Sequence, residues 1–425
     1  MGKREEFKSK VSKVKIALIL IVGVILGVSC IFSKQIESFL GIGDKSGSYV
    51  ASEMIANSDL SIHYIDVEQG DSTLICLPDD KVMLIDAGKP AMAQRIVDYI
   101  QALEITTIDY FIMTHSDDDH TGGAEAVFNN FEVKNVYRPF QIAVGSNGQP
   151  TEYEMLSTYA SIAELDCNKA TEDAYEAFIR CAYTEVGATV YCSYDGLTIE
   201  NVSAGYKFEF FAPIVVDGYD AFDYSATKTI GYPTKSYDEH SDNNASPVIL
   251  FEHQTSSFLF TGDAGFDVEE DLLASLSNDE KERFKNIDVF QAGHHGSNTS
   301  NSKELLELIT PTYTVASCKK SAYGHPGKYF VERLNDIPHS VNDYLLVTEE
   351  IGNIIFGFTE DGKLAYTALE AGAIQGTIYW WRIAVGAFVV ITIIILSVKV
   401  TTNKKATAKR VVSTTKRVTK KIKSK

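Results

Sequence analysis

The chain has 425 residues, with 39 basic and 57 acidic side chains, 45% apolar residues, 29 glycines and 10 prolines. At roughly 100–200 residues per domain, this length allows one large or two modest domains with a real hydrophobic core. The glycine and proline content excludes a collagen-like chain, and the apolar fraction excludes a mostly disordered one.

Charge is distributed unevenly along the chain. Residues 1–15 carry six Lys and Arg against two Glu, and residues 399–425 carry eleven Lys and Arg and no acid. Residues 16–398 therefore hold 22 basic and 55 acidic groups, a balance of −33. Because nucleic-acid binding draws on Lys and Arg contacts to phosphate, this balance argues against a broad groove for polyanions. We also predict no basic stretch interleaved with aromatic residues.

The first predicted element is an uncharged apolar run, Ile16–Phe32, which follows the basic N-terminus (1–15). Its length is close to that of a membrane-spanning helix. A cleaved signal peptide and a lipoprotein anchor on Cys30 are the alternatives. Residues 33–58 are polar, contain glycine and serine, and are predicted to be a linker.

Between residues 59 and 372, short apolar runs alternate with segments of helical periodicity. Strands are predicted at 62–67, 73–77, 82–85, 108–113, 133–137, 248–251, 258–260, 287–290 and 313–317. Helices are predicted at 91–103, from 124, near 170–182, and at 267–276, 302–309 and 327–334. This alternation predicts an α/β domain with mixed sheets. Residues 138–240 break the rhythm, and we interpret them as an elaborated insertion, with an extra structural layer as the alternative.

The last predicted element is a second apolar run, Ile383–Val398, extended by Tyr379, Trp380 and Trp381 to a transmembrane helix over 379–398. Because both ends of the chain are basic, the positive-inside rule places both termini in the cytoplasm and residues 59–372 outside. We therefore predict a cell-membrane protein with two spans and an extracytoplasmic domain. The basic tail (399–425) is expected to lie on anionic membrane lipid, and no protein partner is predicted.

A dense group of potential metal ligands directly follows the predicted strand at 108–113. His115, Asp117, Asp119 and His120 fall within six residues, before Gly122-Gly123. Consecutive carboxylates repel one another if they are buried without a cation. The pattern therefore favours a metal site, with a surface turn of exposed acids as the alternative.

His115-x-Asp117-x-Asp119-His120-x-Gly-Gly resembles the metal-binding motif of the metallo-β-lactamase superfamily, in the variant of the ComEC-type domain of bacterial DNA-uptake channels. Further segments resemble that subfamily in order and spacing: Asp66–Asp71, Ile85–Gly88, Asn244–Val248, Thr261–Ala264, Gly293–Ser297 and Tyr323–Pro326. In the first of them Glu68 replaces a glycine. The resemblance implies an αββα metallo-β-lactamase sandwich, here flanked by one transmembrane helix at each end.

The resemblance also implies a site for two divalent metal ions, Zn or Mn. His115 and Asp117 would bind one ion, and Asp119 and His120 the other. Asp263 would bridge the two, because a carboxylate has two oxygens that can each contact an ion. The abundance of oxygen ligands shifts the preference from zinc towards harder ions such as manganese.

The late histidines complete this implied site. His294 is expected to complete the second ion, whereas His295 is expected to hydrogen-bond the leaving oxygen. A histidine ligand usual for the superfamily, between the first ligand group and the bridging Asp, is not apparent, and His240 in that interval is a weaker candidate. His325 is expected to act as a general acid or a phosphate contact.

The predicted catalytic residues are therefore Asp119, His295 and His325. Asn244, Ser246 and Ser297 are expected to bind substrate through non-bridging phosphate oxygens or an anion-binding turn. For Asn244 and Ser246, an ordinary turn at a strand entry is the alternative. Asp71 and Asp118 are expected to be supporting residues rather than ligands.

Together these features predict a membrane-anchored, extracytoplasmic, metal-dependent hydrolase. The predicted reaction is phosphodiester hydrolysis by a hydroxide activated by two metal ions, with DNA as the leading substrate by resemblance. One alternative substrate is a cell-surface polymer such as choline-bearing teichoic acid, held by tyrosines of residues 138–240. Another alternative is a non-catalytic membrane sensor on the same fold. The chain has two predicted spans, so DNA import through a channel of many helices does not follow from the resemblance.

Overall fold

In the computed structural model, the described residues are 58–154, 168–216, 222–223, 230–232, 234–235, 242–339, 341, 344–359 and 362–369. All of them belong to one compact unit. The predicted transmembrane helices (16–32 and 379–398) and His240 lie outside the described residues. Within the described part of the chain, no helix has the length and apolarity needed to cross a membrane.

The first sheet combines a parallel half and an antiparallel half. Its strands lie in the order β11 (Phe222–Asp223), β12 (Ile230–Gly231), β8 (Thr189–Cys192), β5 (Glu132–Arg138), β4 (Thr107–Ile112), β3 (Val82–Ile85), β2 (Thr73–Cys76), β1 (Ser61–Tyr64), β18 (Asn353–Phe358) and β19 (Leu364–Leu369). The pairs from β3 to β12 are parallel, and the pairs from β3 to β19 are antiparallel. The most C-terminal strands thus pair beside the most N-terminal one.

The second sheet has the same mixed character. Its order is β17 (Leu345–Val347), β16 (Tyr313–Ala316), β15 (Val289–Gln291), β14 (Ser256–Phe260), β13 (Val248–His253), β10 (Tyr206–Ala212) and β9 (Thr198–Asn201). β14 to β17 run parallel, and the remaining pairs are antiparallel. A short parallel pair, β6 (Gln141–Ala143) and β7 (Asn168–Ala170), stands apart.

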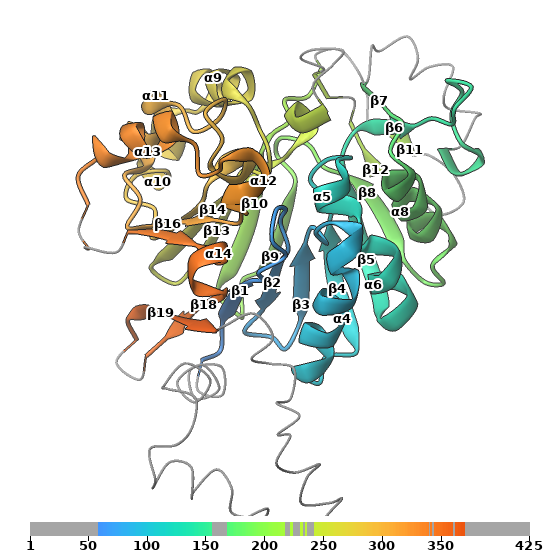
Figure 1. Cartoon of the computed structure of the whole chain (residues 1–425), viewed down its shortest axis with the longest axis horizontal. Helices are drawn as coiled ribbons and strands as arrows, with labels where there is room; N and C mark the ends of the chain where they lie inside the picture. Colours follow the sequence, from blue (N-terminus) through green and yellow to red (C-terminus); the bar gives the residue numbers. More distant parts are fainter. Residues whose placement is uncertain are drawn as a thin grey trace, which may run out of the picture. The chain divides into compact units, whose positions relative to one another are not determined.

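Helices cover the outer face of each sheet (Figure 1). Beside the first sheet lie α4 (Ala93–Ala102), α6 (Ala124–Asn130) and α8 (Asp173–Thr184). Beside the second lie α9 (Phe266–Ser275), α10 (Asn278–Arg283), α11 (Lys303–Ile309) and α13 (Lys328–Asn335). The short elements are α5 (Asp118–Thr121), α12 (Lys320–Tyr323), α14 (Thr348–Ile351), and the 3₁₀ turns η1 (Pro90–Met92), η2 (Glu152–Glu154), η3 (Asp242–Ala245) and η4 (Gly293–Gly296).

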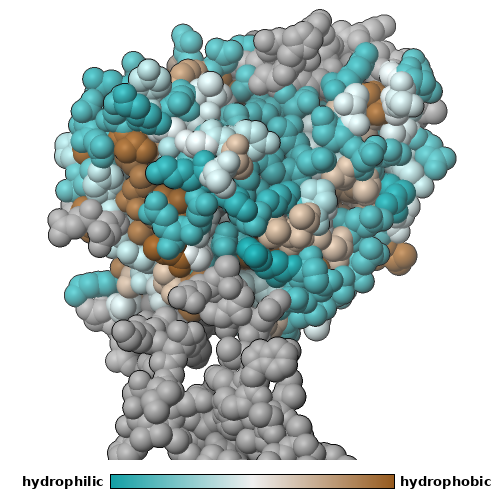
Figure 2. All heavy atoms as spheres, viewed as in Figure 1, coloured by the Kyte–Doolittle hydropathy of each residue, from teal (hydrophilic) through white to brown (hydrophobic). Residues whose placement is uncertain are grey.

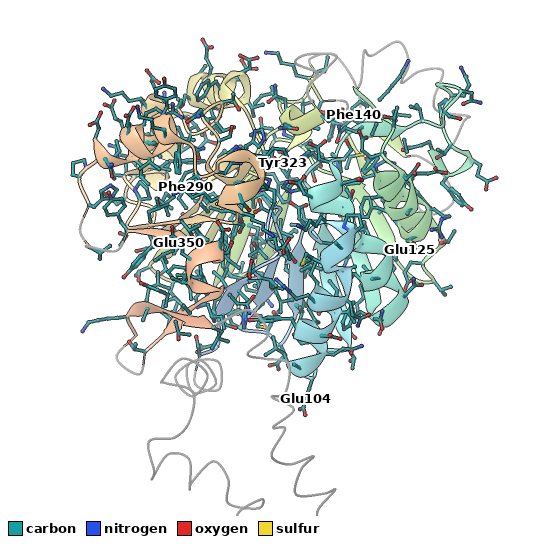
Figure 3. The ribbon with its side chains drawn as sticks, viewed as in Figure 1. Glu104, Glu125, Phe140, Phe290, Tyr323 and Glu350 are labelled. Atoms are coloured by element: carbon teal, nitrogen blue, oxygen red, sulfur yellow. The ribbon has the colours of Figure 1, made fainter. Side chains whose placement is uncertain are left out.

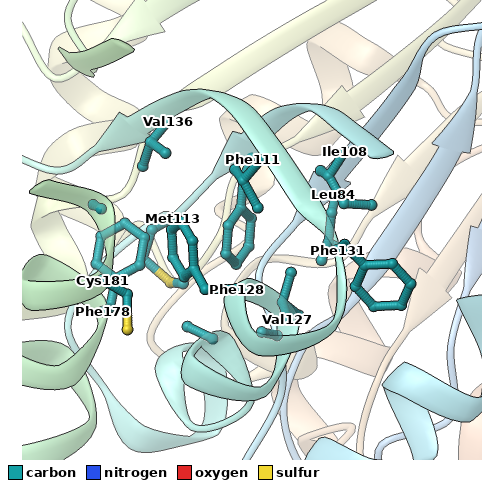
Figure 4. Packing of buried hydrophobic residues seen from close by; sticks show 14 of the residues in the cluster. Leu84, Ile108, Phe111, Met113, Val127, Phe128, Phe131, Val136, Phe178 and Cys181 are labelled. Carbon is teal, nitrogen blue, oxygen red and sulfur yellow. The ribbon is translucent and has the colours of Figure 1, made fainter. Parts of the chain in front are cut away.

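Three buried apolar clusters separate these four layers. Side chains alternate across a strand, so in β13 Ile249 packs between the two sheets while Leu250 packs under the outer helices. In the cluster under α6 and α8, Phe111 contacts Phe128 and Phe178 at ring-centroid distances of 5.6 and 5.9 Å (Figure 4). Removing such a ring costs about 3–5 kcal/mol of folding free energy. These layers confirm the predicted αββα sandwich.

The strands and helices predicted from the sequence are present with shifts of a few residues at their ends. Val82–Ile85 is predicted and found as β3 without a shift. The 138–240 segment, however, is not set apart from the sandwich, because β8 extends the first sheet and β9 and β10 form an edge of the second. Its join to β5 contains a buried ion pair, in which Arg138 donates to both oxygens of Glu154 at 2.9 Å.

Candidate functional site

Loops that follow the strands of both sheets meet at one edge of the sandwich. The carboxyl ends of parallel strands are where such loops gather. β4 is followed by Thr114–Gly123, β14 by Thr261–Ala264 and β15 by the turn η4. The β1–β2 loop joins them, since Asp71 N–H donates to the Asp119 carbonyl at 3.2 Å. Gly70 permits this approach: a Cβ there would lie 2.2 Å from that carbonyl oxygen.

One group of side chains at this edge centres on two imidazoles. His120 Nε2 and His295 Nε2 lie 3.3 Å apart. His295 Nε2 is 3.2 Å from Asp119 Oδ2, and His120 Nε2 is 3.2 Å from Asp263 Oδ1. The structure therefore places His295, rather than His294, with His120 and Asp119.

A second group shares Asp263 with the first. His115 Nε2 lies 3.6 Å from Asp117 Oδ2 and 3.9 Å from Asp263 Oδ2. His294 Nε2 lies 3.6 Å from Asp263 Oδ2. Asp263 therefore contacts both groups, as the bridging role predicted for it requires, and His294 lies on the side of His115.

The turn η4 separates the two neighbouring histidines. His294 and His295 have φ of 51° and 56°, in the left-handed region that non-glycine residues seldom adopt. Buried Asn301 holds the turn, because its side chain accepts from Gly293 N–H at 2.8 Å and donates to the Gly293 carbonyl at 2.8 Å. This backbone sends one imidazole to each group.

The contacts of the Nδ1 atoms indicate which ring nitrogen of His120, His115 and His295 faces the site. His120 Nδ1 donates to Asp86 Oδ2 at 2.7 Å, so the Nε2 of a neutral ring carries a lone pair. The Thr114 hydroxyl donates to the same oxygen of Asp86 at 2.7 Å and lies 3.0 Å from His115 Nδ1. His295 Nδ1 lies 3.5 Å from Asp71 Oδ1. Each of the three rings thus presents Nε2 to the centre.

Carboxylates and imidazoles shift one another's pKa strongly here. Burial opposes ionisation of Asp263, but the imidazoles of His295 and His120 hold the pKa of that carboxyl well below its usual range. Burial also disfavours the charged imidazoles, yet Asp263 and Asp86 raise the pKa of His120, and Asp263 and Asp71 raise the pKa of His295, well above the ordinary value. The carboxylates of the cluster are therefore stabilised by positive charge placed among them.

Divalent metal ions supply this positive charge better than protons do. Buried atoms without a hydrogen-bond partner among the described residues gather here: His115 Nε2, His295 Nδ1, Asp263 Oδ1 and both oxygens of Asp71. Protons on both facing Nε2 atoms would repel one another, whereas a cation satisfies two lone pairs. Ligand atoms about 2.0–2.1 Å from a tetrahedral ion stand about 3.3 Å apart, close to the 3.2–3.9 Å separations found here. The residues present thus fit divalent ions held by imidazole and carboxylate.

The residues predicted to bind substrate lie close behind this cluster. Fully buried Ser246 lies 3.3 Å from His115 Nδ1, and its hydroxyl accepts from Asp263 N–H at 3.0 Å. Asn244 Oδ1 accepts from Gly265 N–H, and Ser297 contacts the hydroxyl of Thr299. These contacts orient the ligands and their loops, and a role of the three side chains in substrate binding stays a prediction.

His325 lies at the outer side of the two adjacent histidines. Its ring centroid is 5.7 Å from that of His294 and 6.2 Å from that of His295. Burial, with the neighbouring imidazoles, lowers the pKa of His325 to about 4. Asp118, by contrast, is exposed in the first turn of α5, away from the ligand atoms.

Asp71, which the sequence predicts to support the site rather than to bind metal, has its Oδ1 3.5 Å from His295 Nδ1. Its carboxylate is buried and belongs with His120, Asp263 and His295 to one group of closely spaced ligand atoms. The acids of the Asp66–Asp71 segment are visible in the sequence, but the approach of Asp71 to Asp119 is not. Glu68 has φ of 64°, a conformation that suits the glycine of the resembling motif, and pairs with Lys89 and Lys319.

Comparison with known proteins agrees with this architecture. The family model described as the metallo-beta-lactamase superfamily matches residues 65–319. ComE operon protein 3 of Bacillus subtilis (strain 168) is 23% identical over 320 residues, which cover 71% of this chain and 33% of that protein. Competence protein ComA of Neisseria gonorrhoeae is 26% identical over 315 residues, which cover 74% of this chain and 34% of that protein. The chain thus spans about a third of the length of these relatives.

Among solved structures, a metallo-beta-lactamase HARLDQ motif mutant from Cronobacter sakazakii matches with 15% identity and a TM-score of 0.30. The match covers 54% of this chain and 73% of that one.

Proposed function

The chain belongs to the metallo-β-lactamase superfamily, and from this premise we propose that it is a metal-dependent phosphodiesterase that hydrolyses DNA outside the cytoplasm while anchored in the cell membrane. The fold and the buried cluster of His and Asp are those of a superfamily hydrolase with divalent metal ions. The phosphodiester, the DNA substrate and the membrane anchor are the parts that we propose.

One observation carries the proposal: a single buried carboxylate, Asp263, contacts two separate groups of ligand atoms. Its Oδ1 lies 3.2 Å from His120 Nε2, and its Oδ2 lies 3.5–3.9 Å from the Nε2 atoms of His295, His294 and His115. Two divalent ions held there would supply Lewis-acid stabilisation for both the attacking and the leaving oxygen of an in-line displacement. Phosphodiester hydrolysis uses both of these effects.

The residues around the cluster complete this chemistry. Asp86 and Thr114 contact Nδ1 of His120 and His115, so the Nε2 atom of each ring faces the cluster. His325 has its pKa lowered to about 4, so its ring is neutral at pH 7 and donates one N–H to a phosphate oxygen. This favours the predicted phosphate contact over a charged general acid.

DNA as the substrate class comes from the resemblance to the ComEC-type domain of DNA-uptake channels, and two relatives are named for the ComE operon and for competence. The alternative of a choline-bearing polymer stays a prediction, but two of the tyrosines in the 138–240 segment have another role. Tyr175 and Tyr183 of the 138–240 segment are buried around Arg138, with the guanidinium 6.0 and 5.9 Å from their rings. They therefore offer no open aromatic cage.

The test uses the full-length protein, stripped of metal and reloaded with Mn²⁺ or Zn²⁺. Its substrates are single-stranded DNA, double-stranded DNA and bis(p-nitrophenyl) phosphate. We expect Asp263→Asn to lower turnover of every substrate about 1,000-fold or more, because several kcal/mol of transition-state stabilisation are lost. The matched control is Asp267→Asn, an exposed acid at the start of α9, which should leave turnover unchanged.

Cleavage of the small diester without DNA cleavage would sink the DNA substrate and keep the phosphodiesterase. Absence of turnover with either ion, despite bound metal, would contradict the enzyme and favour a sensor.

A further inference from the structure

The segment 319–329 connects β16 to α13 and has an unusual composition for this acidic protein. Its sequence is KKSAYGHPGKY, with three Lys, two Tyr and one His and no acid. We call Lys319, Lys320, Tyr323, Lys328 and Tyr329 the Lys–Tyr strip. It is the aromatic-interleaved basic stretch that the overall charge did not lead us to expect.

Both tyrosines of the strip face solvent. Tyr323 is 74% exposed and Tyr329 is 59% exposed, which places them among the most exposed large apolar side chains of the described residues. Figure 3 shows Tyr323 on α12, near the middle of a face that is mostly hydrophilic in Figure 2. Most of the Tyr323 ring is therefore accessible to a ligand, whereas the Lys328 ammonium lies 5.7 Å from the centre of the Tyr329 ring, so a base that stacks there meets a positive charge.

The strip leads directly into the metal-ligand cluster. The Tyr323 ring lies 6.1 Å from the ring of His325, and His325 lies 5.7 Å from His294. A ligand stacked on Tyr323 is thus two rings away from Asp263, to which His294 Nε2 is 3.6 Å distant.

Backbone contacts hold the strip to the loop that carries the late histidines. Gly327 N–H donates to the Gly296 carbonyl at 2.8 Å, and Asn298 Oδ1 accepts from Tyr329 N–H at 2.8 Å. A Cβ on Gly327 would lie 2.4 Å from that Asn298 oxygen, so glycine is required for this approach. The strip and the cluster therefore keep a set spacing.

Charge selects the class of ligand. Among the described residues Lys320 makes no ion pair, and Lys328 is 77% exposed with Glu332 3.4 Å away. Exposed pairs of this kind contribute little, so Lys328 is available to a phosphate. Ammonium groups repel a quaternary ammonium but attract phosphate, and open tyrosine faces stack on unpaired bases.

We propose that the Lys–Tyr strip binds single-stranded nucleic acid, with bases stacked on Tyr323 and Tyr329 and phosphates at Lys320 and Lys328, and feeds the strand to the cluster. This inference deepens the proposed function and rests on it for the cleavage step alone. Duplex DNA, whose bases are already stacked, would use only the lysines.

The experiment measures binding separately from cleavage. Fluorescence anisotropy of a labelled 20-nucleotide single strand is recorded with the full-length, metal-free protein across a range of salt concentrations. We expect Tyr323→Ala and Tyr329→Ala each to weaken binding about tenfold or more, whereas Tyr323→Phe and Tyr329→Phe keep affinity within about threefold. Lys320→Ala should lower the slope of log affinity against log salt by about 1.

The proposed binding of single-stranded nucleic acid would be wrong if the alanine variants bind like the wild type. It would also be wrong if duplex DNA binds as tightly as the single strand, or if inorganic polyphosphate competes equally at the same phosphate concentration. Circular dichroism of the variants verifies folding, and the phenylalanine variants control for local damage. Strip-dependent binding without DNA cleavage by the metal-loaded wild type would uphold the strip and sink the proposed nuclease. DNA cleavage by the wild type, together with unchanged DNA binding in the alanine variants, would support the proposed nuclease and contradict the role of the Lys–Tyr strip.

Discussion

Two groups of side chains that could bind metal lie among the described residues, and they differ in the pKa shifts of their carboxyl groups. The buried cluster consists of Asp71, His120, Asp263 and His295. The rim cluster consists of Asp117, Glu172 and Asp242, which are half-buried. Within each group the ligand atoms lie within 4.8 Å of one another, so spacing alone does not distinguish a metal site from a gathering of acids.

Asp263 of the buried cluster and Asp242 of the rim cluster have pKa shifts in opposite directions, whereas the pKa of Asp117 on the rim is lowered, because its contact with His115 outweighs burial. In the buried cluster, imidazoles outweigh burial and lower the pKa of Asp263 well below its usual range. In the rim cluster, burial together with Glu172 and Asp117 raises the pKa of Asp242 to about 6. Asp242 therefore relieves repulsion by taking up a proton as the pH falls to about 6, whereas Asp263 keeps its charge. Imidazoles with Nε2 directed at the carboxylates therefore distinguish the metal site from the group of acids at the rim.

The largest effect on metal binding is expected when one of the two adjacent histidines, His294 or His295, is replaced at a time. We expect His295→Gln to weaken binding of one ion at least 100-fold, because it removes the partner of both His120 and Asp119. His294→Gln should weaken binding of the other ion about tenfold, since its side chain is 28% exposed. Bound metal per chain, measured by elemental analysis after dialysis at defined free Mn²⁺, gives both values. A larger loss in His294→Gln would restore the assignment expected from the sequence.

The sequence predicts His294 beside Asp119 and His120, whereas the structure places His295 there, and this difference has a physical cause. Gly-His-His-Gly identifies two candidate ligands, but only a left-handed backbone at both positions separates their rings, and sequence carries no signal for that strain. By contrast, the ligand group His115–His120 is predictable, because four potential ligands within six residues directly follow a predicted strand and match the motif of the resembling family.

The same limit applies to the fold. Local patterns identify β3 and α4, but the pairing of β18 with β1 joins residues nearly 300 positions apart, which no local pattern encodes. Exposure of Tyr323 is another such property: the alternation of Lys and Tyr is visible in the sequence, but the open ring faces are not.

His63 is a buried imidazole without a neighbouring carboxylate among the described residues, and its pKa shift is opposite to the shifts of His120 and His295. His63 is fully buried, with Tyr99 and Ser61 hydroxyls 2.8 Å from its ring nitrogens, and burial lowers its pKa from 6.5 to about 3. Since the folded pKa is depressed, the stability contributed by neutral His63 is full above pH 6.5 and is lost as pH falls towards 3. Between pH 7 and pH 5 this loss amounts to about 2 kcal/mol.

Urea unfolding of metal-free wild type and His63→Gln at pH 7 and pH 5 measures that loss. The free energy of unfolding should fall about 2 kcal/mol further in the wild type than in the variant over this interval. Equal falls in the two proteins would show that burial alone does not keep this imidazole neutral, and would weaken the contrast with His120 and His295.

The smallest effect is expected at the rim. Asp242→Asn removes a carboxyl that is partly protonated near pH 6 and accepts a hydrogen bond from Gln141 at 3.0 Å, which an amide oxygen can also accept. Because Asp242 contacts neither Asp263 nor the imidazoles of the buried cluster in any ion pair of the described residues, we expect less than a threefold change in metal affinity and in phosphodiester turnover. Elemental analysis and bis(p-nitrophenyl) phosphate hydrolysis at pH 7.5 measure both, with Glu172→Gln as the matched partner. Loss of one bound ion in either variant would make the rim a metal site in its own right, and imidazoles would then no longer separate the two clusters.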